Sequence, residues 1–241
     1  MSTGPNHDNL MALIERQIHR GRIYIGWRIR TKILLWNLTL KGTCALKRTL
    51  DMVLSLMAMA VLSPIFAITA IAIFGESPGP IFFAQTRVGL NGRHFRFFKF
   101  RSMVVNAEAL KAQLAASNES GDGVIFKMKK DPRVTRVGWF IRKFSIDELP
   151  QLFNVLKGDM SMVGPRPPVP KEVALYTMED RKRLHVKPGI TCIWQVSGRS
   201  NIPFKQQVAL DKKYIRCKSL LGDLKILLQT IPAVLSGRGA Y

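Results

Sequence analysis

The sequence predicts an α+β protein that is mostly helical, with a compact domain, a small β-hairpin and an apolar membrane helix broken at a proline. Three observations predict this architecture: an uncharged stretch of 23 residues at 52–74, two short strand-like segments around an Asn-Gly turn, and several amphipathic segments after them. The 241 residues suit one medium-sized domain with attachments, because domains usually have about 50 to 250 residues.

The first 46 residues read as a basic extension. From Leu10 onward, basic side chains interleave with apolar ones, a pattern typical of an amphipathic segment on a membrane surface, although an ordinary amphipathic element packed on a core fits equally well. Over the whole chain, Lys and Arg outnumber Asp and Glu by 37 to 16. We therefore expect an anionic partner: nucleic acid, a phospholipid surface or a phosphorylated substrate. The three cysteines and four scattered histidines argue against a disulfide scaffold and a zinc site.

The uncharged stretch at residues 52–74 is long enough to cross a hydrocarbon core of about 30 Å at about 1.5 Å per residue. Pro64 lies at its centre, where it removes a backbone hydrogen bond and kinks a helix, and Ser63 is placed to bond a carbonyl freed at the break. Basic residues flank both ends, Lys47 and Arg48 among them, and such flanks prefer the cytoplasmic side. The pattern favours a re-entrant hairpin over a single span or a buried core helix.

After this stretch the sequence predicts a hairpin and then helices. Residues 81–88 and 93–101 read as strands, and Asn91 and Gly92 supply the backbone freedom of a tight turn. Helices are expected at residues 104–116, 137–143, 150–157, 203–214 and 219–235, with a polar loop at 117–123. On the last helix we expect one broad buried stripe, formed by Leu220, Leu221, Leu224, Leu227, Leu228 and Ile231.

Two adjacent carboxylates, Asp147 and Glu148, are the first candidates for chemistry. They precede the helix expected at 150–157 and closely follow Arg142. The positive end of a helix dipole and nearby cations keep a carboxylate ionised, ready to attack or to bind a metal. The alternative is a purely structural capping box formed by Ser145 and Glu148.

Two rigid turns each present one arginine: residues 164–167 present Arg166, and residues 198–200 present Arg199. A planar guanidinium contacts phosphate oxygens bidentately. Arginine in turns is usually solvated surface. Together with the carboxylate pair and a lipid-facing segment, however, the two turns suggest a diphosphate substrate, since phosphoryl transfer needs charge neutralisation and a fixed nucleophile.

The segment that joins these features is similar to a known signature. Residues 145–167, SIDELPQLFNVLKGDMSMVGPRP, closely resemble the signature of the bacterial sugar transferases, the monotopic phosphoglycosyl transferases. Shorter matches are KFRSM at 99–103, DPRVTRVG at 131–138, KPGIT at 187–191 and WQVSGR at 194–199. The resemblance covers residues 47–241. It implies a re-entrant membrane helix region at 47–78 and a catalytic domain at 79–241 on the cytoplasmic face of the bacterial inner membrane.

The resemblance also implies a two-step reaction that begins exopolysaccharide repeat assembly. Asp147 attacks the β-phosphorus of a UDP-sugar, UMP leaves, and undecaprenyl phosphate then takes the sugar phosphate from the enzyme. Mg²⁺ near Asp147 neutralises the diphosphate, and Glu148 assists in positioning or proton transfer. Residues 230–241 look most like transferases that start with galactose or glucose phosphate.

Further positions follow from the family's motifs. The expected phosphate-binding residues are Arg142, Arg166 and Arg199, surrounded by Lys99, Arg101 and Asp211. Ser63 and Pro64 match the helix-break dipeptide, and Lys47 and Arg48 match the basic membrane entrance. The bland alternatives are a solvated strand face for Lys99 and Arg101 and an ion pair for Asp211. Two departures, Cys192 for a common glycine and Ser200 for a common asparagine, leave the carboxylate pair intact.

The expected partners are a UDP-sugar, undecaprenyl phosphate, membrane lipids, a second copy of the chain and downstream glycosyltransferases, but no nucleic acid. The rival hypothesis is a non-catalytic basic protein that binds membrane surfaces or nucleic acid. It explains the positive charge, but gives no use to the carboxylate pair beside two arginine turns.

Overall fold

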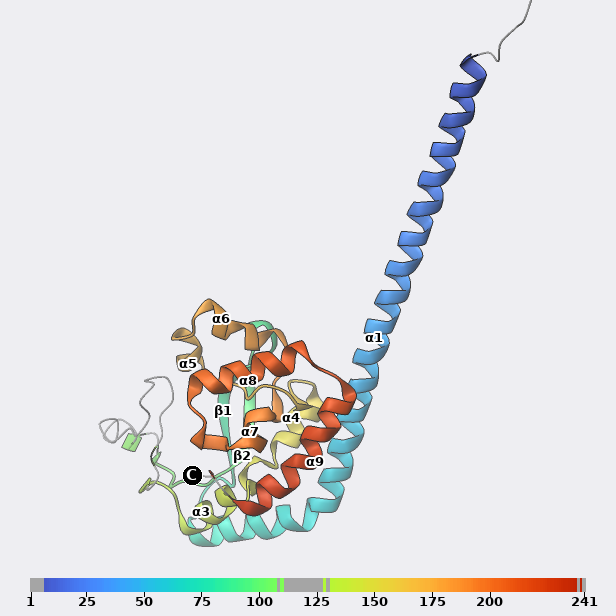
Figure 1. The fold of residues 1–241 in the computed structure, drawn as a ribbon. Helices are drawn as coiled ribbons and strands as arrows, with labels where there is room; N and C mark the ends of the chain where they lie inside the picture. The colour runs from blue at the N-terminus through green and yellow to red at the C-terminus, as the bar shows by residue number, and fades with distance from the viewer. Residues whose placement is uncertain (1–6, 108, 111–127, 129–130, 238, 240–241) are drawn as a thin grey trace, which may run out of the picture. The chain divides into compact units, whose positions relative to one another are not determined.

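The computed structural model describes residues 7–107, 109–110, 128, 131–237 and 239 (Figure 1). The chain divides into two compact units, Met1–Thr49 and Leu50–Tyr241. In the first, the described residues belong to helix α1, His7–Glu76, whose later turns lie in the second unit. The second unit adds short helices and two small sheets, which confirms the prediction of a mostly helical α+β protein.

The predicted apolar stretch lies in α1. The segment Gly42–Glu76 has a mean hydropathy of 2.3 and is 11% buried in its most apolar window, so by length and composition it is able to cross a membrane. Pro64 is inside the helix, and Figure 1 shows the cyan end of α1 bending and running toward α3. Ser63 Oγ donates to the carbonyl of Ala60, 2.8 Å away. This is the carbonyl that Pro64, without an N–H, leaves unbonded. The predicted role of Ser63 is confirmed, and a re-entrant path through a membrane stays a prediction.

The predicted hairpin is confirmed. Strands β1, Phe82–Val88, and β2, His94–Phe100, are antiparallel, with Gln85 opposite Phe97 and Phe83 opposite Lys99. The turn η1, Leu90–Gly92, places Asn91 at φ 53°, a left-handed conformation that asparagine tolerates better than most residues.

A second sheet was not predicted. Strands β3, Ser161–Val163, and β4, Gly189–Thr191, pair in parallel, and three residues are too few to show an alternating pattern. A Cβ on Gly189 would lie 2.0 Å from the backbone nitrogen of Gly164, so only glycine permits this approach. Because the strands are parallel, the segments that follow them leave at the same end, which brings the two predicted arginine turns together.

Most of the predicted helices are present. The helices after the hairpin are α3 Arg136–Lys143, α4 Gln151–Lys157, α5 Pro170–Ala174, α6 Met178–Arg181, α7 Ile193–Ser197, α8 Phe204–Arg216 and α9 Leu220–Ser236. Gly158, at φ 95°, ends α4 as its position predicts. The helix predicted at 104–116 and the loop at 117–123 fall largely outside the described residues.

The buried stripe predicted on α9 is wrong. Four of its six members are exposed: Leu221 81%, Leu224 52%, Leu228 60% and Ile231 59%. The helix instead buries Asp223 and Ile226. Two hydrogen bonds of 2.8 Å hold that face inward, one from the Tyr214 hydroxyl to Asp223 Oδ1 and one between the hydroxyls of Thr191 and Thr230. A buried polar group needs a partner, so these bonds decide which face packs.

The end of α1 packs against the hairpin and α3. Phe66 makes an edge-on contact with Phe100 at 5.3 Å between ring centroids, and Ile73 lies in one core cluster with Phe100 and Ile141. Glu76 caps α3, since its carboxylate accepts from the backbone nitrogens of Arg136 at 2.8 Å and Val137 at 2.9 Å. These contacts fix α3 beside the segment that carries the predicted carboxylates.

A second anchor joins α1 to β3. Asp51 Oδ1 accepts from the backbone nitrogen of Met162 at 3.1 Å, and Ser55 Oγ donates to the sulfur of Met162 at 3.3 Å. Asp51 and Ser55 are both buried. The apolar helix is therefore tied to the strand that leads into the Arg166 turn.

Candidate functional site

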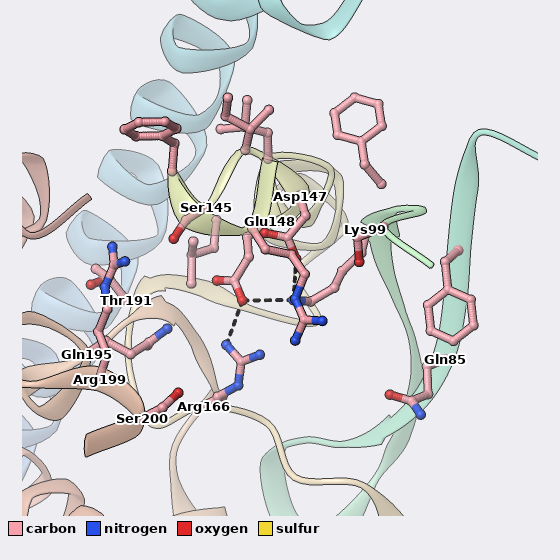
Figure 2. Close-up of a pocket in the computed structure, with 18 of the residues that line it drawn as sticks. Gln85, Lys99, Ser145, Asp147, Glu148, Arg166, Thr191, Gln195, Arg199 and Ser200 are labelled. Atoms are coloured by element: carbon pink, nitrogen blue, oxygen red, sulfur yellow. Dashed lines mark hydrogen bonds and ion pairs between the residues drawn. The ribbon is translucent and has the colours of Figure 1, made fainter. Parts of the chain in front are cut away.

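The two predicted carboxylates lie side by side in a 3-10 turn, Ile146–Glu148, between α3 and α4. Lys99 Nζ, from β2, is 2.9 Å from Asp147 Oδ2 and 2.9 Å from Glu148 Oε1 (Figure 2). Arg166 Nη1 is 2.8 Å from the same oxygen of Glu148. Ser145 adopts φ 54° and its side chain makes no capping bond. The capping-box alternative is therefore excluded, and both carboxylates face cations.

Charge holds Glu148 ionised. Burial opposes ionisation of its carboxyl, but Arg166 and then Lys99 overcome it and lower the pKa of Glu148 far below its usual range. Burial likewise disfavours the charged form of Arg166, yet Glu148 raises the pKa of this guanidinium. Near neutral pH the group is a carboxylate clasped between two cations, well suited to hold them and poorly suited to carry a proton.

Asp147 is held differently. Its carboxylate is buried, and its Oδ2 is bonded to Lys99, while Oδ1 has no hydrogen-bond partner among the described residues. A carboxylate group held in place through one oxygen, with the other oxygen unbonded, is able to act as a nucleophile or as a metal ligand.

The residues fit a Mg²⁺ ion only as a partial ligand set. The described part of the chain contains no group of three or more His, Cys, Asp or Glu side chains placed to hold a metal. Mg²⁺, however, is commonly held by one or two carboxylates and completed by water and substrate phosphates. Asp147, with Glu148 beside it, meets that requirement.

The carboxylates open into a cavity of about 1210 Å³, larger than the 300–1,000 Å³ typical of small-molecule sites. One wall is polar and contains Asp147, Glu148, Lys99 and Arg166. The cavity is also lined by apolar residues of α1 and α9, namely Ala58, Leu62, Ile65, Ile231, Val234 and Leu235. The cavity thus offers ionic and lipid-like surroundings together.

Five of the six predicted phosphate-site residues line this cavity: Arg142, Arg166, Arg199, Lys99 and Arg101. Arg199 starts a 3-10 turn, Arg199–Asn201, at φ 52°. Burial lowers the pKa of Arg199, while the charges of Glu148 and Asp147 raise it. Arg199 is therefore within electrostatic reach of both carboxylates, as Figure 2 illustrates.

Arg101 lines the cavity but also has a structural bond, and the other predicted residues lie elsewhere. Arg101 is buried, and its Nη2 donates to the carbonyl of Ser77. Asp211 is not among the lining residues. It is buried in an ion pair with Arg183, whose Nη2 is 2.5 Å from Asp211 Oδ2, which was the bland alternative for this residue. The membrane-entrance pair, Lys47 and Arg48, lies on α1 in the first unit, and the helix-break pair, Ser63 and Pro64, on α1 in the second.

Comparison with known proteins agrees with this geometry. The profile of the family described as bacterial sugar transferase matches residues 42–237, which is most of the chain. The chain belongs to the bacterial sugar transferase family.

Three relatives show how far the similarity extends. A galactosyl transferase, CpsE, of Streptococcus agalactiae serotype III is 49% identical over 195 residues, or 80% of this chain and 43% of that protein. The exopolysaccharide production protein ExoY of Sinorhizobium fredii is 40% identical over 198 residues, or 81% of this chain and 88% of that protein. An undecaprenyl-phosphate galactose phosphotransferase of Salmonella typhimurium is 43% identical over 208 residues, or 85% of this chain and 44% of that protein. The chain thus spans less than half of two of these relatives and most of ExoY.

The structure of this sugar transferase also brings residues to the cavity that motif reading missed. Arg87 of β1 lines it, and so does Arg183, which stacks over the ring of Tyr176 at 5.8 Å. For Arg87 a signal existed. Alternation along the hairpin places Arg87 on the same face as Lys99, because Arg87 pairs with Phe95 and Lys99 with Phe83. For Arg183 we find no local signal, since its ion-pair partner, Asp211, comes from the distant helix α8.

Proposed function

We propose that this protein transfers a sugar 1-phosphate from a UDP-sugar to undecaprenyl phosphate, releasing UMP and forming undecaprenyl-diphosphate-sugar, the first step of exopolysaccharide repeat assembly. The observation that carries the proposal is Asp147. Its Oδ1 is unbonded among the described residues, its Oδ2 is fixed by Lys99, and it opens into a cavity with cations on one wall and apolar side chains on another.

In the first step, Asp147 Oδ1 attacks the β-phosphorus of the UDP-sugar. A bond forms between the carboxylate oxygen and this phosphorus, and the bond from the phosphorus to the UMP oxygen breaks, so UMP leaves with the electron pair. The sugar phosphate remains bound to Asp147 as an acyl phosphate. Lys99, Arg166 and Arg199 supply the positive charge that the phosphate oxygens need in the transition state.

In the second step, a phosphate oxygen of undecaprenyl phosphate attacks the same phosphorus and Asp147 is released as a carboxylate. The polyprenyl chain needs an apolar path to this point. The apolar residues of α1 that line the cavity, Ala58, Leu62 and Ile65, offer one, because they belong to the helix that is able to enter a membrane.

Glu148 acts by position. Its strongly lowered pKa keeps it charged throughout, so it holds Lys99 and Arg166 in place and moves no proton. When bound beside Asp147, Mg²⁺ would neutralise charge on the diphosphate.

The names of the relatives support the substrates. CpsE is named a galactosyl transferase and the Salmonella protein an undecaprenyl-phosphate galactose phosphotransferase, whereas other relatives are named for glucose. We propose galactose or glucose as the sugar. The rival hypothesis of a basic nucleic-acid binder does not explain why Lys99 and Arg166 are paired with the two carboxylates inside the cavity.

We propose that the protein resides in the bacterial inner membrane with the cavity on the cytoplasmic face. α1 supports this location, because its apolar segment is mostly exposed. The leucines on the outer face of α9 support it as well, since large exposed apolar surfaces mark contacts with membranes or other proteins.

The test supplies purified protein with a panel of UDP-sugars, Mg²⁺ and undecaprenyl phosphate and measures released UMP. We expect lipid-dependent UMP from one or two sugars, and a sugar phosphate trapped on Asp147 when lipid is omitted. Asp147→Asn should abolish both signals, whereas Asp159→Asn, a carboxylate outside the cavity paired with Lys157, should retain them. Full activity of Asp147→Asn would disprove the covalent mechanism.

The path of α1 has its own test. A Cβ added at Gly75 would meet open space, with nothing within 4 Å, so Gly75→Cys is tolerable, and Cys44 is naturally exposed. In a background without Cys192 and Cys217, both thiols should react with a membrane-impermeant label from the cytoplasmic side. Labelling from opposite sides would mean that α1 spans the membrane.

A further inference from the structure

Arg87 is a half-buried cation for which the described part of the chain supplies no counter-ion. It lies at the end of β1 and lines the cavity. Among the described residues no carboxylate is within ion-pair distance of its guanidinium, and its Nε is shielded from solvent with no hydrogen-bond partner. An unpaired buried charge is costly, and a protein tolerates the cost where a ligand of opposite charge arrives.

The guanidinium is held in a fixed position. Its Nη1 donates to the carbonyl of Pro167 at 3.0 Å, and its Cζ lies 5.2 Å from the ring centroid of Phe97. Stacking on an aromatic face orients the planar group, and the bond to Pro167 ties it to the turn that presents Arg166. Both arginines are therefore presented by one rigid unit, built from the hairpin and the turn.

The charges around Arg87 include a second cation. Burial, reinforced by the cation Arg166, lowers the pKa of Arg87 to about 10, and the charges of Glu172 and Glu148 only partly offset this. Arg87 and Arg166 therefore lie close together, in agreement with the bond from Arg87 Nη1 to the carbonyl of Pro167, the residue that follows Arg166.

We infer that Arg87 is a further substrate-binding residue, which contacts the phosphate of the leaving nucleoside monophosphate beside Arg166. The inference rests on the proposed function, because it takes a nucleoside diphosphate sugar to be the ligand of this part of the cavity. Binding of the leaving phosphate beside Arg166 supplies the counter-ion that Arg87 lacks among the described residues.

The test measures binding of UMP and of uridine to the detergent-solubilised full chain by calorimetry. Arg87→Met keeps an unbranched apolar stem and removes the guanidinium and its charge. We expect it to weaken UMP binding roughly 10- to 100-fold, as for a lost hydrogen bond to a charged group, and to leave uridine binding within about twofold, because uridine carries no phosphate. Arg87→Lys should recover part of the loss. The matched control is Arg96→Met, which removes an exposed arginine from the other face of the same hairpin and should change neither affinity.

Three outcomes would overturn the inference. Wild-type affinity for UMP in Arg87→Met would show that Arg87 does not contact the phosphate. Equal weakening of UMP and uridine would show that Arg87 only supports the Pro167 turn. Loss of uridine binding alone would place Arg87 at the nucleoside. If instead the wild-type protein neither binds UMP nor releases it from any UDP-sugar, the proposed function itself fails, which is a distinguishable result.

Discussion

Replacing Glu148 by glutamine tests whether this carboxylate is the clasp that holds the cationic wall. Glu148 Oε1 accepts from Lys99 at 2.9 Å and from Arg166 at 2.8 Å, and its side chain is 15% exposed. Each hydrogen bond to a charged group contributes about 1.5–3 kcal/mol. A glutamine oxygen keeps one weaker bond, so we expect a net loss of about 2–4 kcal/mol in the free energy of unfolding.

The measurement is thermal unfolding of the detergent-solubilised protein. For chains of this size, 1 kcal/mol corresponds to a Tm change of about 2–4 °C, so Glu148→Gln should lower Tm by about 4–16 °C at pH 7. The matched control is Glu179→Gln. Glu179 also lies between two cations, Lys182 at 2.5 Å and Lys212 at 3.5 Å, but its side chain is 60% exposed. Solvent screens such a pair, and Tm should change little.

The same substitution has a predicted pH dependence. The pKa of Glu148 is lower in the folded protein than in the unfolded chain, so its contribution to stability is present above the ordinary pKa of glutamate, about 4.3, and is lost as pH falls below it. The Tm difference between wild type and Glu148→Gln should therefore be constant from pH 8 to 6 and shrink below about pH 4. If Glu148→Gln has the Tm of the wild type at pH 7, or if the control Glu179→Gln lowers Tm as much, Glu148 does not stabilise the fold by holding Lys99 and Arg166.

Three other changes have defined outcomes. Asp147→Asn should reduce UMP release by at least about 1,000-fold while Tm stays within a few degrees, as measured by a coupled nucleotide assay, because the amide loses the nucleophilic oxygen but keeps the shape. Asp51→Leu should lower stability by about 1.5–3 kcal/mol in thermal unfolding, because the backbone nitrogen of Met162 loses its charged acceptor; Asp51→Asn should cost less, and equal losses would contradict the bond. Glu76→Gln should lower Tm slightly at pH 7 by weakening the cap on α3, and since the folded pKa of Glu76 is lowered, the difference from wild type should fade as pH drops below about 4.

Much of the site was predictable from the sequence because several of its residues lie close together in one distinctive sequence motif. Asp147, Glu148 and Arg166 all lie within residues 145–167, so the motif named them together. Lys99 was expected nearby, and the structure adds what it does, since its Nζ joins both carboxylates at 2.9 Å. Arg87 was missed because a single arginine in a strand looks like a solvated face until the opposite strand and the Pro167 turn enclose it.

The sequence by itself determined the elements with strong local signals: the hairpin with its Asn-Gly turn, the helix that Gly158 ends, the apolar length of α1, and the bond from Ser63 to the carbonyl that Pro64 frees. Local geometry sets these features, and no distant partner is needed. Only the tertiary structure decided which face of α9 is buried, because Tyr214 and Thr191 hold Asp223 and Thr230 inward against the leucine pattern. It also decided the pairing of β3 with β4 and the enclosure of Arg87. The bond between Thr191 and Thr230, the pairing of β3 with β4 and the bond from Arg87 to Pro167 all join residues far apart in the chain, and a buried polar group needs such a partner.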